Sequence, residues 1–140
     1  MLAYQPIRSL ATINMMFYQG AAGAERVFKV LDKKPDIKEN ENYPNLKIET
    51  GNIEFENVSF VYPQTEVAAI RNINISVKGG TTAALVGHSG AGKSTIINLI
   101  PRFYDPQKGK VQIDKQKINE VSLVSLRKNI SLVSQDIMLF

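Results

Sequence analysis

The segment from residue 87 to residue 94 has the residue types and spacing that phosphate binding requires. Its members are Gly87, His88, Ser89, Gly90, Ala91, Gly92, Lys93 and Ser94. Phosphate oxygens need many donors from one side, and backbone N–H groups supply them where glycines keep side chains out of the way. The lysine would add a full charge at the β and γ oxygens, and the last serine would ligate magnesium. The pattern therefore predicts a loop that binds a nucleoside triphosphate with Mg2+.

The neighbours of this loop support the same prediction. An apolar run at 83–86 precedes it, and residues 95–100 read as a helix that Pro101 ends. A strand before the loop and a helix after it form the context that identifies a phosphate loop. The helix would also direct unpaired N–H groups and its positive dipole end at the phosphates. The alternative is a glycine-rich strand-to-helix turn that carries a surface lysine.

The composition is ordinary for a soluble globular domain. The 140 residues are 44% hydrophobic and 21% charged, which suits one domain with a real core. The absence of cysteine excludes disulfides and thiolate-bound metals. The net charge of +4 includes no block of like charges, so we expect no nucleic acid partner. No run of about 18 apolar residues occurs, so we expect no complete membrane span.

The first fifty residues combine a helical pattern with a polar stretch. Apolar side chains recur in steps of three and four from Ile7 to Leu31, on one helical face. The helix begins without a cap, as the tail of a longer helix would, although an amphipathic helix packed on its own domain has the same pattern. Residues 32–50 are polar, charged and interrupted by Pro35 and Pro44. We therefore expect a linker and a domain boundary there.

Beyond residue 51 the hydrophobic pattern changes to a period of two. One alternating strand covers 53–62, and a shift of its phase near Asn57 predicts a bulge. A second covers 73–77, and together they predict an antiparallel layer with one covered face. The segment Thr82–Val86 does not alternate, so we expect a central parallel strand that is buried on both faces.

Three further elements are expected after the phosphate loop. Residues 111–113 read as a strand and residues 123–129 as a helix. Residues 130–133 are expected to form a second buried strand, which ends at Ser134-Gln135-Asp136.

Several short motifs occur in an order typical of one family. They are Tyr62-Pro63, Gly87 to Ser94, Tyr104-Asp105-Pro106, Leu126-Arg127 and Val133-Ser134-Gln135-Asp136. In this order they resemble the nucleotide-binding domain of an ATP-binding-cassette (ABC) transporter. Residues 17–28 are similar to the cytoplasmic end of the last transmembrane helix in exporters that fuse membrane and ATPase domains. The bacterial lipid and multidrug exporter is the most similar type, and the resemblance covers nearly the whole chain.

The resemblance implies an α/β fold and a set of partners. The fold would be the N-terminal half of a P-loop nucleotide-binding domain, with an antiparallel β layer and parallel core strands, preceded by a membrane-domain helix. Residues 1–31 would end a transmembrane domain, 32–50 would be the linker, and 51–140 would be a truncated nucleotide-binding domain. ATP and Mg2+ are the implied cofactors. The implied partners are the transmembrane domain of the same transporter, a facing nucleotide-binding domain in a homodimer, and the membrane, at the cytoplasmic face of the inner membrane.

The resemblance also assigns roles to individual residues. Tyr62 matches the aromatic residue that stacks on adenine, although a strand-end tyrosine with a solvated hydroxyl is the alternative. Gln135 matches the glutamine that approaches magnesium and the attacking water and senses the membrane domain; a polar strand cap is the alternative. Thr95 would bond an α-phosphate oxygen or simply continue the helix. His88 occupies a variable loop position and is not the family's switch histidine.

Other parts of the family's active site do not occur in these residues. No apolar strand ends in Asp-Glu, so the second magnesium ligand and the general base are missing, as are the Leu-Ser-Gly-Gly-Gln signature and the switch histidine. Lys93 and Gln135 remain as the expected catalytic residues, and Ser94 and Gln135 as the magnesium ligands. We therefore expect a fragment that binds ATP weakly and does not turn over alone.

Three functions compete at this point. The first is the ATP-binding part of an exporter that couples ATP hydrolysis to substrate export, and the second is a nucleotide-binding or inert remnant without turnover. The third is a different phosphate-loop enzyme such as a GTPase, which requires Asn-Lys-x-Asp and Asp-x-x-Gly strings that the sequence lacks. A comparison of ATP binding with ATP hydrolysis separates the first two.

Overall fold

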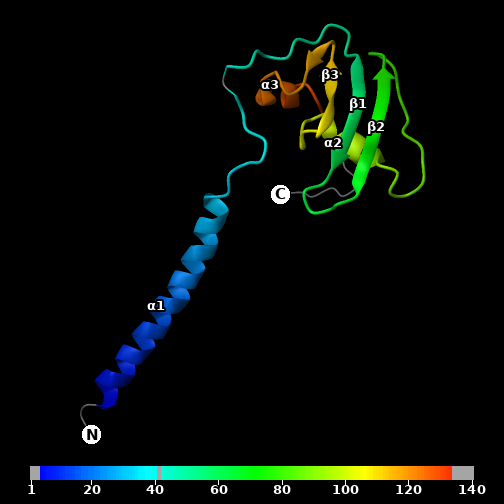
Figure 1. Ribbon diagram of the computed structural model, residues 1–140. Coiled ribbons are helices and arrows are strands. Elements are labelled where there is room, and N and C mark those ends of the chain that lie inside the picture. Colours follow the sequence, from blue (N-terminus) through cyan, green and yellow to red (C-terminus); the bar gives the residue numbers. More distant parts are fainter. Residues whose placement is uncertain (1–3, 41, 134–140) are drawn as a thin grey trace. The chain divides into compact units, whose positions relative to one another are not determined.

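The structure is a computed structural model that describes residues 4–40 and 42–133. The chain forms two compact units, Met1–Asp36 and Ile37–Phe140 (Figure 1).

The first unit is a single helix, α1, from Tyr4 to Leu31. The helix predicted from the apolar stripe is confirmed and begins three residues before Ile7. An ion pair joins Glu25 to Lys29 one turn later, at 2.7 Å. Within residues 4–40 and 42–133, no helix combines the length and apolar character that a membrane crossing requires.

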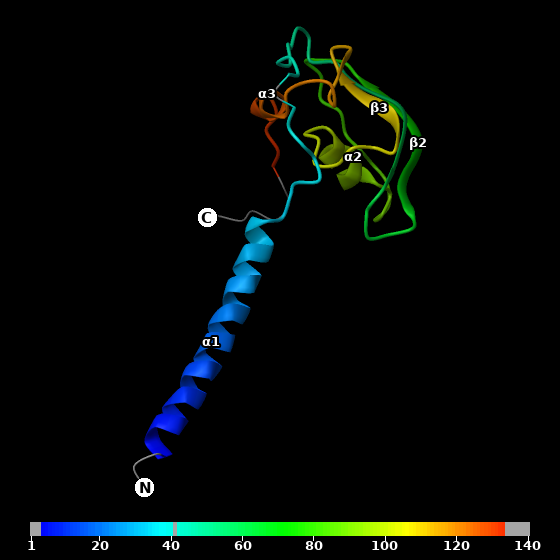
Figure 2. The ribbon, with the colours of Figure 1, turned by 60° about the vertical axis from the view of Figure 1, so that its left-hand side comes forward.

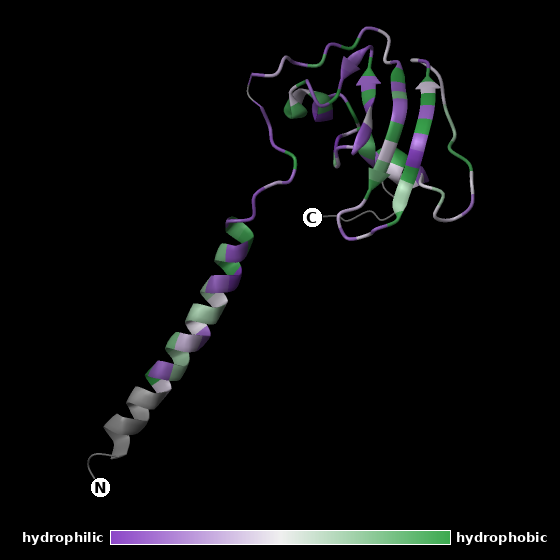
Figure 3. Ribbon diagram, in the orientation of Figure 1, coloured by the Kyte–Doolittle hydropathy of each residue, from purple (hydrophilic) through white to green (hydrophobic). Residues whose placement is uncertain are grey.

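The second unit is built on a four-stranded antiparallel sheet. Its strands are β1 (Ile53–Val61), β2 (Ala68–Val77), β3 (Lys108–Ile113) and β4 (Gln116–Lys117), in the spatial order β2-β1-β3-β4. Strand β1 pairs with β2 on one side and with β3 on the other. Apolar and polar bands alternate along β2 (Figure 3), as in a sheet with one covered face. The predicted antiparallel layer is confirmed.

A bulge at Asn57 interrupts β1. This residue has a left-handed φ of 49°, and the register against β2 shifts between Phe55 and Val58. The Asn57 N–H donates to the side-chain oxygen of Asn74 at 2.9 Å, and the Asn74 amide donates back to the Asn57 side chain at 3.2 Å. The extra residue allows Phe55, Val58 and Phe60 all to be buried in the core. The predicted bulge is confirmed.

Two short helices cover one face of the sheet. Helix α2 (Lys93–Leu99) and helix α3 (Leu123–Lys128) lie on the same side of it (Figure 2). Leu99 and Leu126 are completely buried, and the hydroxyl of Ser122 caps the start of α3. The rest of the buried apolar core consists of Leu46, Phe55, Val58, Phe60, Ile70, Val111, Ile113, Ile118, Val121 and Leu123.

The structure differs from the sequence prediction in the two apolar runs that were expected to be parallel strands. Neither 82–86 nor 130–133 forms a strand, and Val86 and Val133 are 90% and 88% exposed. A parallel strand requires hydrogen-bonded neighbours and cover on both faces. The four strands within residues 42–133 pair only antiparallel with one another, so neither run has such a neighbour. For the described residues, the prediction of parallel core strands is wrong.

Most of the segment that reads as a linker belongs to the second unit. We call residues 37–52 the strap. Leu46 is buried, and its N–H donates to the hydroxyl of Ser125 on α3 at 3.0 Å. The backbone of Lys47 exchanges two hydrogen bonds with the side chain of Gln116 on β4. The strap therefore has fixed contacts with α3 and β4, although its composition is polar.

The carboxylate of Asp114, in the turn after β3, holds the end of the strap. Its Oδ2 accepts hydrogen bonds from the N–H groups of Glu49, Thr50 and Gly51 at 2.8, 3.0 and 2.9 Å. Its Oδ1 accepts from the Asn52 N–H at 2.9 Å and from the Thr50 hydroxyl. These bonds, led by the one from the Thr50 hydroxyl, hold the pKa of Asp114 well below its ordinary value.

Candidate functional site

The predicted phosphate loop joins an exposed segment, 81–86, to the start of α2. Gly92 is the residue that caps α2, and its φ of 82° lies in the left-handed region. A Cβ atom there would also lie 2.6 Å from Cγ2 of Ile70 and 2.7 Å from the carbonyl oxygen of Ala69. Glycine is thus required at position 92 both by the backbone conformation and by the close approach of β2.

The side chain of Lys93 lies across this loop. Its Nζ donates to the carbonyl oxygens of Gly87 at 2.9 Å and His88 at 2.7 Å. The loop therefore curls around a positive charge. Neutral carbonyls are weaker acceptors for an ammonium group than phosphate oxygens, which carry a full negative charge. A phosphate group at the loop would compete favourably for the same ammonium.

The loop is open to solvent. Residues 81–90 are exposed throughout, and so is Ser94 in the first turn of α2. The ring of His88 is engaged by the loop itself, because Nδ1 lies 2.8 Å from the carbonyl oxygen of Ser89. A backbone bond of 3.2 Å from the Ala91 N–H to the His88 carbonyl closes the turn. A polyphosphate can reach the loop without displacing any core residue.

Tyr62 lies at the end of β1 beside the first turn of α2. Its hydroxyl is 3.1 Å from Oγ1 of Thr95, which is buried. Its ring makes edge contacts with Phe60 and Tyr104, at centroid distances of 4.8 and 5.1 Å. The structure therefore brings Tyr62 and Thr95 together beside the loop. Adenine stacking by Tyr62 and an α-phosphate bond from Thr95 remain predictions.

Comparison with known proteins places this site in a family. The family model described as "ABC transporter" matches residues 70–140. The ATP-dependent lipid A-core flippase of Syntrophus aciditrophicus (strain SB) is 44% identical over 139 residues, which are 99% of this chain and 23% of the flippase. The flippase of the same name from Escherichia coli (strain K12) is 43% identical over 97% of this chain and 23% of its own length.

The chain belongs to the ABC transporter family.

A solved structure supports the same assignment at the level of the fold. It is described as the structure of a bacterial Atm1-family ABC exporter with ATP bound. It matches 97% of this chain with a TM-score of 0.78 and 34% identity, over 24% of its own length. The chain thus spans about a quarter of the length of the relatives that it matches.

The magnesium ligands predicted for this ABC transporter chain are only partly within the described residues. Ser94 is exposed at the loop, whereas Gln135 lies outside the described residues. Within residues 4–40 and 42–133, no three His, Asp or Glu side chains gather in a way that would hold a metal ion. An exposed hydroxyl beside a loop with a lysine suits Mg2+ that arrives together with a polyphosphate, because Mg2+ is held mainly by substrate phosphates and water.

Two arginines to which the sequence assigned no role fix the turn after α2. Arg102 is buried, has a left-handed φ of 54°, and makes a bidentate ion pair with Asp105 at 2.7 and 3.0 Å. That hydrogen-bonded pair raises the pKa of Arg102. Arg127 on α3 donates from Nε to the Pro101 carbonyl at 3.0 Å and from Nη2 to the Arg102 carbonyl at 2.9 Å. Its guanidinium lies 5.4 Å from the ring centroid of Phe103. In the sequence, the signals that could have indicated these contacts were the motifs Leu126-Arg127 and Tyr104-Asp105-Pro106, which contain Arg127 and the partner of Arg102.

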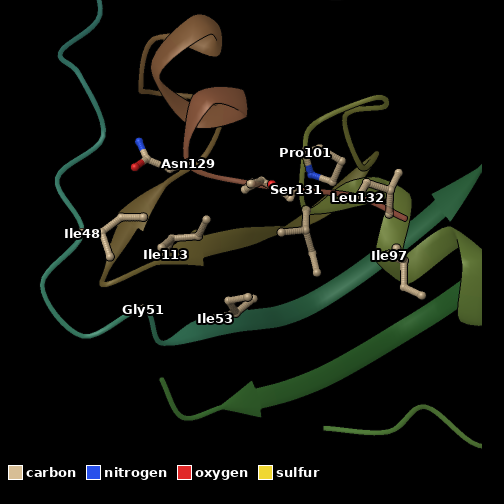
Figure 4. Close-up of a pocket in the computed structure, with 11 residues that line it drawn as sticks. Ile48, Gly51, Ile53, Ile97, Pro101, Ile113, Asn129, Ser131 and Leu132 are labelled. Atoms are coloured by element: carbon tan, nitrogen blue, oxygen red, sulfur yellow. The ribbon is translucent and has the colours of Figure 1, made fainter. Parts of the chain in front are cut away.

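An apolar pocket of about 340 Å³ lies on the helix-covered side of the sheet (Figure 4). Its walls include Ile53 of β1, Ile97 of α2, Ile113 of β3 and Leu132. None of the predicted site residues within the described part of the chain lines it. Aliphatic walls suit the packing of apolar groups, so the candidate nucleotide site is the phosphate loop and not this pocket.

Proposed function

We propose that this chain is the ATP-binding part of an exporter that couples ATP hydrolysis to the movement of a substrate across a membrane. The observation that carries the proposal is the position of the Lys93 ammonium, which lies within the loop that the carbonyls of Gly87 and His88 form. This arrangement offers a positive charge and an open backbone loop to a polyphosphate. The 44% identity to an ATP-dependent lipid A-core flippase supports the same function.

The residues of the chain would divide the work of nucleotide binding. The loop from Gly87 to Ser94, followed by Thr95, would hold the phosphates, and Tyr62 would lie against the adenine. Ser94 and Gln135 would hold Mg2+. When bound, Mg2+ neutralises charge on the β and γ oxygens, and Lys93 would add to this effect. Gln135 would orient the attacking water.

The proposed setting follows the flippases that the chain resembles. We propose an exporter of the lipid and multidrug type, at the cytoplasmic face of the inner membrane. Residues 1–31 would belong to its transmembrane domain, 32–50 would lead into the ATPase, and 51–140 would form part of the nucleotide-binding domain. A second nucleotide-binding domain would face this one in a homodimer.

Titration of a fluorescent ATP analogue against the purified chain tests the site. Loss of a charge-assisted bond to phosphate costs about 1.5–3 kcal/mol, so Lys93→Ala should weaken binding about 10- to 150-fold. Tyr62→Ala removes a stacking contact worth about 1 kcal/mol and should weaken ATP and ADP equally, by about fivefold. Lys78→Ala, an exposed lysine after β2, is the control and should bind as the wild type. Equal affinities for the Lys93 and Lys78 variants would refute the assignment.

The alternative is that these 140 residues, taken by themselves, are a nucleotide-binding or inert remnant that does not hydrolyse ATP. The observation in its favour is that these 140 residues contain no Asp-Glu pair after an apolar strand and therefore no general base of the family's kind. A positioned base typically contributes about 10²- to 10⁴-fold. Phosphate release by the purified chain distinguishes the two. We expect binding without measurable turnover, and steady magnesium-dependent release that Lys93→Ala abolishes would contradict that expectation.

A further inference from the structure

Helix α3 receives a carboxylate from the strap at its first turn. Oε1 of Glu39 accepts hydrogen bonds from the Ser122 hydroxyl at 2.9 Å and from the Leu123 N–H at 3.1 Å, and Oε2 accepts from the same N–H at 3.0 Å. Glu39 and Leu123 are 84 residues apart in the sequence. A negative charge at the start of a helix is favourable both as an acceptor and through the helix dipole. Glu39 thus helps to cap α3 from a distant part of the chain.

Two further bonds join the strap to the same turn of α3. The Ser122 N–H donates to the carbonyl of Pro44 at 2.9 Å, and the Leu46 N–H donates to the hydroxyl of Ser125 at 3.0 Å. Helix α3 has only six residues, and a helix of that length is marginal without tertiary contacts. The order of α3 therefore depends on whether the strap is attached.

The other end of α3 is hydrogen-bonded to the turn that follows α2. Arg127 donates two hydrogen bonds to the consecutive carbonyls of Pro101 and Arg102, and both bonds come from one planar guanidinium. Helix α2 begins at Lys93 and has seven residues, which corresponds to a length of about 10 Å. Its first residue belongs to the phosphate loop, and its last turn leads to the carbonyls that Arg127 holds.

We propose that α3 couples the strap to the phosphate-loop helix, with Glu39 and Arg127 as the positioning residues at its two ends. When the hydrogen bonds of Glu39 break, the first turn of α3 frays. The hydrogen bonds of Arg127 then weaken, and the turn after α2 becomes less ordered. The same contacts act in the reverse direction, because a coupling free energy is reciprocal. This route runs from the strap to the turn after α2 through named hydrogen bonds and lies within the second unit.

Hydrogen exchange of the whole 140-residue chain tests the coupling without any nucleotide. The reporters are two pairs of amides. In the strap, the N–H groups of Leu46 and Lys47 bond to side chains; at the end of α2, those of Arg102 and Phe103 bond to the carbonyls of Leu99 and Asn98. Amides between β1 and β2 report on global unfolding.

Glu39→Gln removes a charge and weakens the cap of α3. We expect exchange about fivefold faster in the strap and also at Phe103. Phe103 is the decisive reporter, because the charge of Glu39 also acts directly on Arg102. Glu120→Gln is the matched control, because among the described residues the carboxylate of Glu120 pairs only with Lys117, on the surface at 2.7 Å, and should change neither pair of amides. Acceleration confined to the strap, or a uniform rise that includes the sheet amides, would overturn the coupling.

Arg127→Gln tests the reverse direction. Exchange should become faster at Arg102 and Phe103 and also at Leu46 and Lys47, whereas Lys128→Gln, on the same helix, should leave both pairs unchanged. In the double variant the effects should be smaller than the product of the single effects, since both residues act through α3. Independent, multiplicative effects would overturn the proposal. If Arg127→Gln does not fold, the Glu39 result alone decides.

The consequence for nucleotide affinity rests on the proposed function. Glu39→Gln should weaken binding of the fluorescent ATP analogue about two- to fivefold, and Glu120→Gln should not, because a less ordered α2 must be ordered again on binding. A wild-type chain that binds no ATP would refute the proposed function, and the exchange measurements would still decide whether α3 couples the strap to α2. A wild-type chain that binds ATP with the same affinity as Glu39→Gln would refute the extension to nucleotide.

Discussion

Substitution of Gly92 by alanine tests how tightly β2 constrains the phosphate loop. The substitution adds one methyl group at a residue with a φ of 82°, and that methyl would lie 2.6 Å from Cγ2 of Ile70 and 2.7 Å from the Ala69 carbonyl oxygen. Gly90 provides the matched control in the same loop. Its φ is 81°, and a Cβ there meets no atom within 4 Å.

The magnitudes follow from this difference. A left-handed conformation costs an alanine about 1–2 kcal/mol at either position. The overlap at position 92 involves a backbone carbonyl, which cannot rotate away as a flexible side chain can, and forced overpacking costs about 1–3 kcal/mol more. Gly90→Ala should therefore destabilise the chain by about 1–2 kcal/mol and Gly92→Ala by about 2–5 kcal/mol.

Urea unfolding measures the two variants on one scale. With a slope of about 1.5 kcal/mol per molar, the additional 1–3 kcal/mol lowers the midpoint for Gly92→Ala by about 0.7–2 M relative to Gly90→Ala. The slope itself should stay constant. Equal midpoints for the two variants would show that β2 yields to the added methyl group, and the account of the close approach would be wrong.

Two further predictions concern the strap. Because the pKa of Asp114 is depressed in the folded chain, its carboxylate stabilises the fold above about pH 4 and ceases to do so as the pH falls through the folded pKa. The stability difference between wild type and Asp114→Asn should therefore shrink between pH 5 and pH 2 in urea titrations, and a constant difference would contradict it. Trypsin should cut first after Lys33, close to the boundary of the two compact units, and more slowly after Lys47, whose backbone is bonded to Gln116. Primary cleavage after Lys47 would show that the strap is not held.

The features that the sequence predicted correctly depend on local rules. The apolar stripe from Ile7 to Leu31 predicted α1, because side chains three and four residues apart share a helical face. The change of phase at Asn57 predicted the bulge, because one extra residue reverses the alternation of a strand. The pattern from Gly87 to Ser94 predicted a glycine-rich loop before a helix, and the structure contains one.

The features that the sequence did not predict depend on distant partners. The run at 82–86 is as apolar as a buried strand, but a strand also requires a neighbour, and a local pattern does not reveal whether one is present. The strap reads as a linker because side chains such as Glu39 and Asp114 bond to backbone groups far away in the sequence. Such bonds leave no periodicity. The two bonds from Arg127 to the end of α2 are equally invisible, since they join residues 25 and 26 positions apart.

The attachment of the strap determines where this chain can be divided or recombined. A cut at Gly51 follows the change in composition, but it would separate Leu46 from the core and Glu39 from α3, and it would remove donors from the carboxylate of Asp114. A junction within 32–36 leaves all of these pairs together. Exchange of ATPase domains between related transporters should accordingly succeed with junctions in that five-residue interval. With a junction at residue 51, the exchange would require the two parent proteins to have the same residues in the strap and at the positions that contact it.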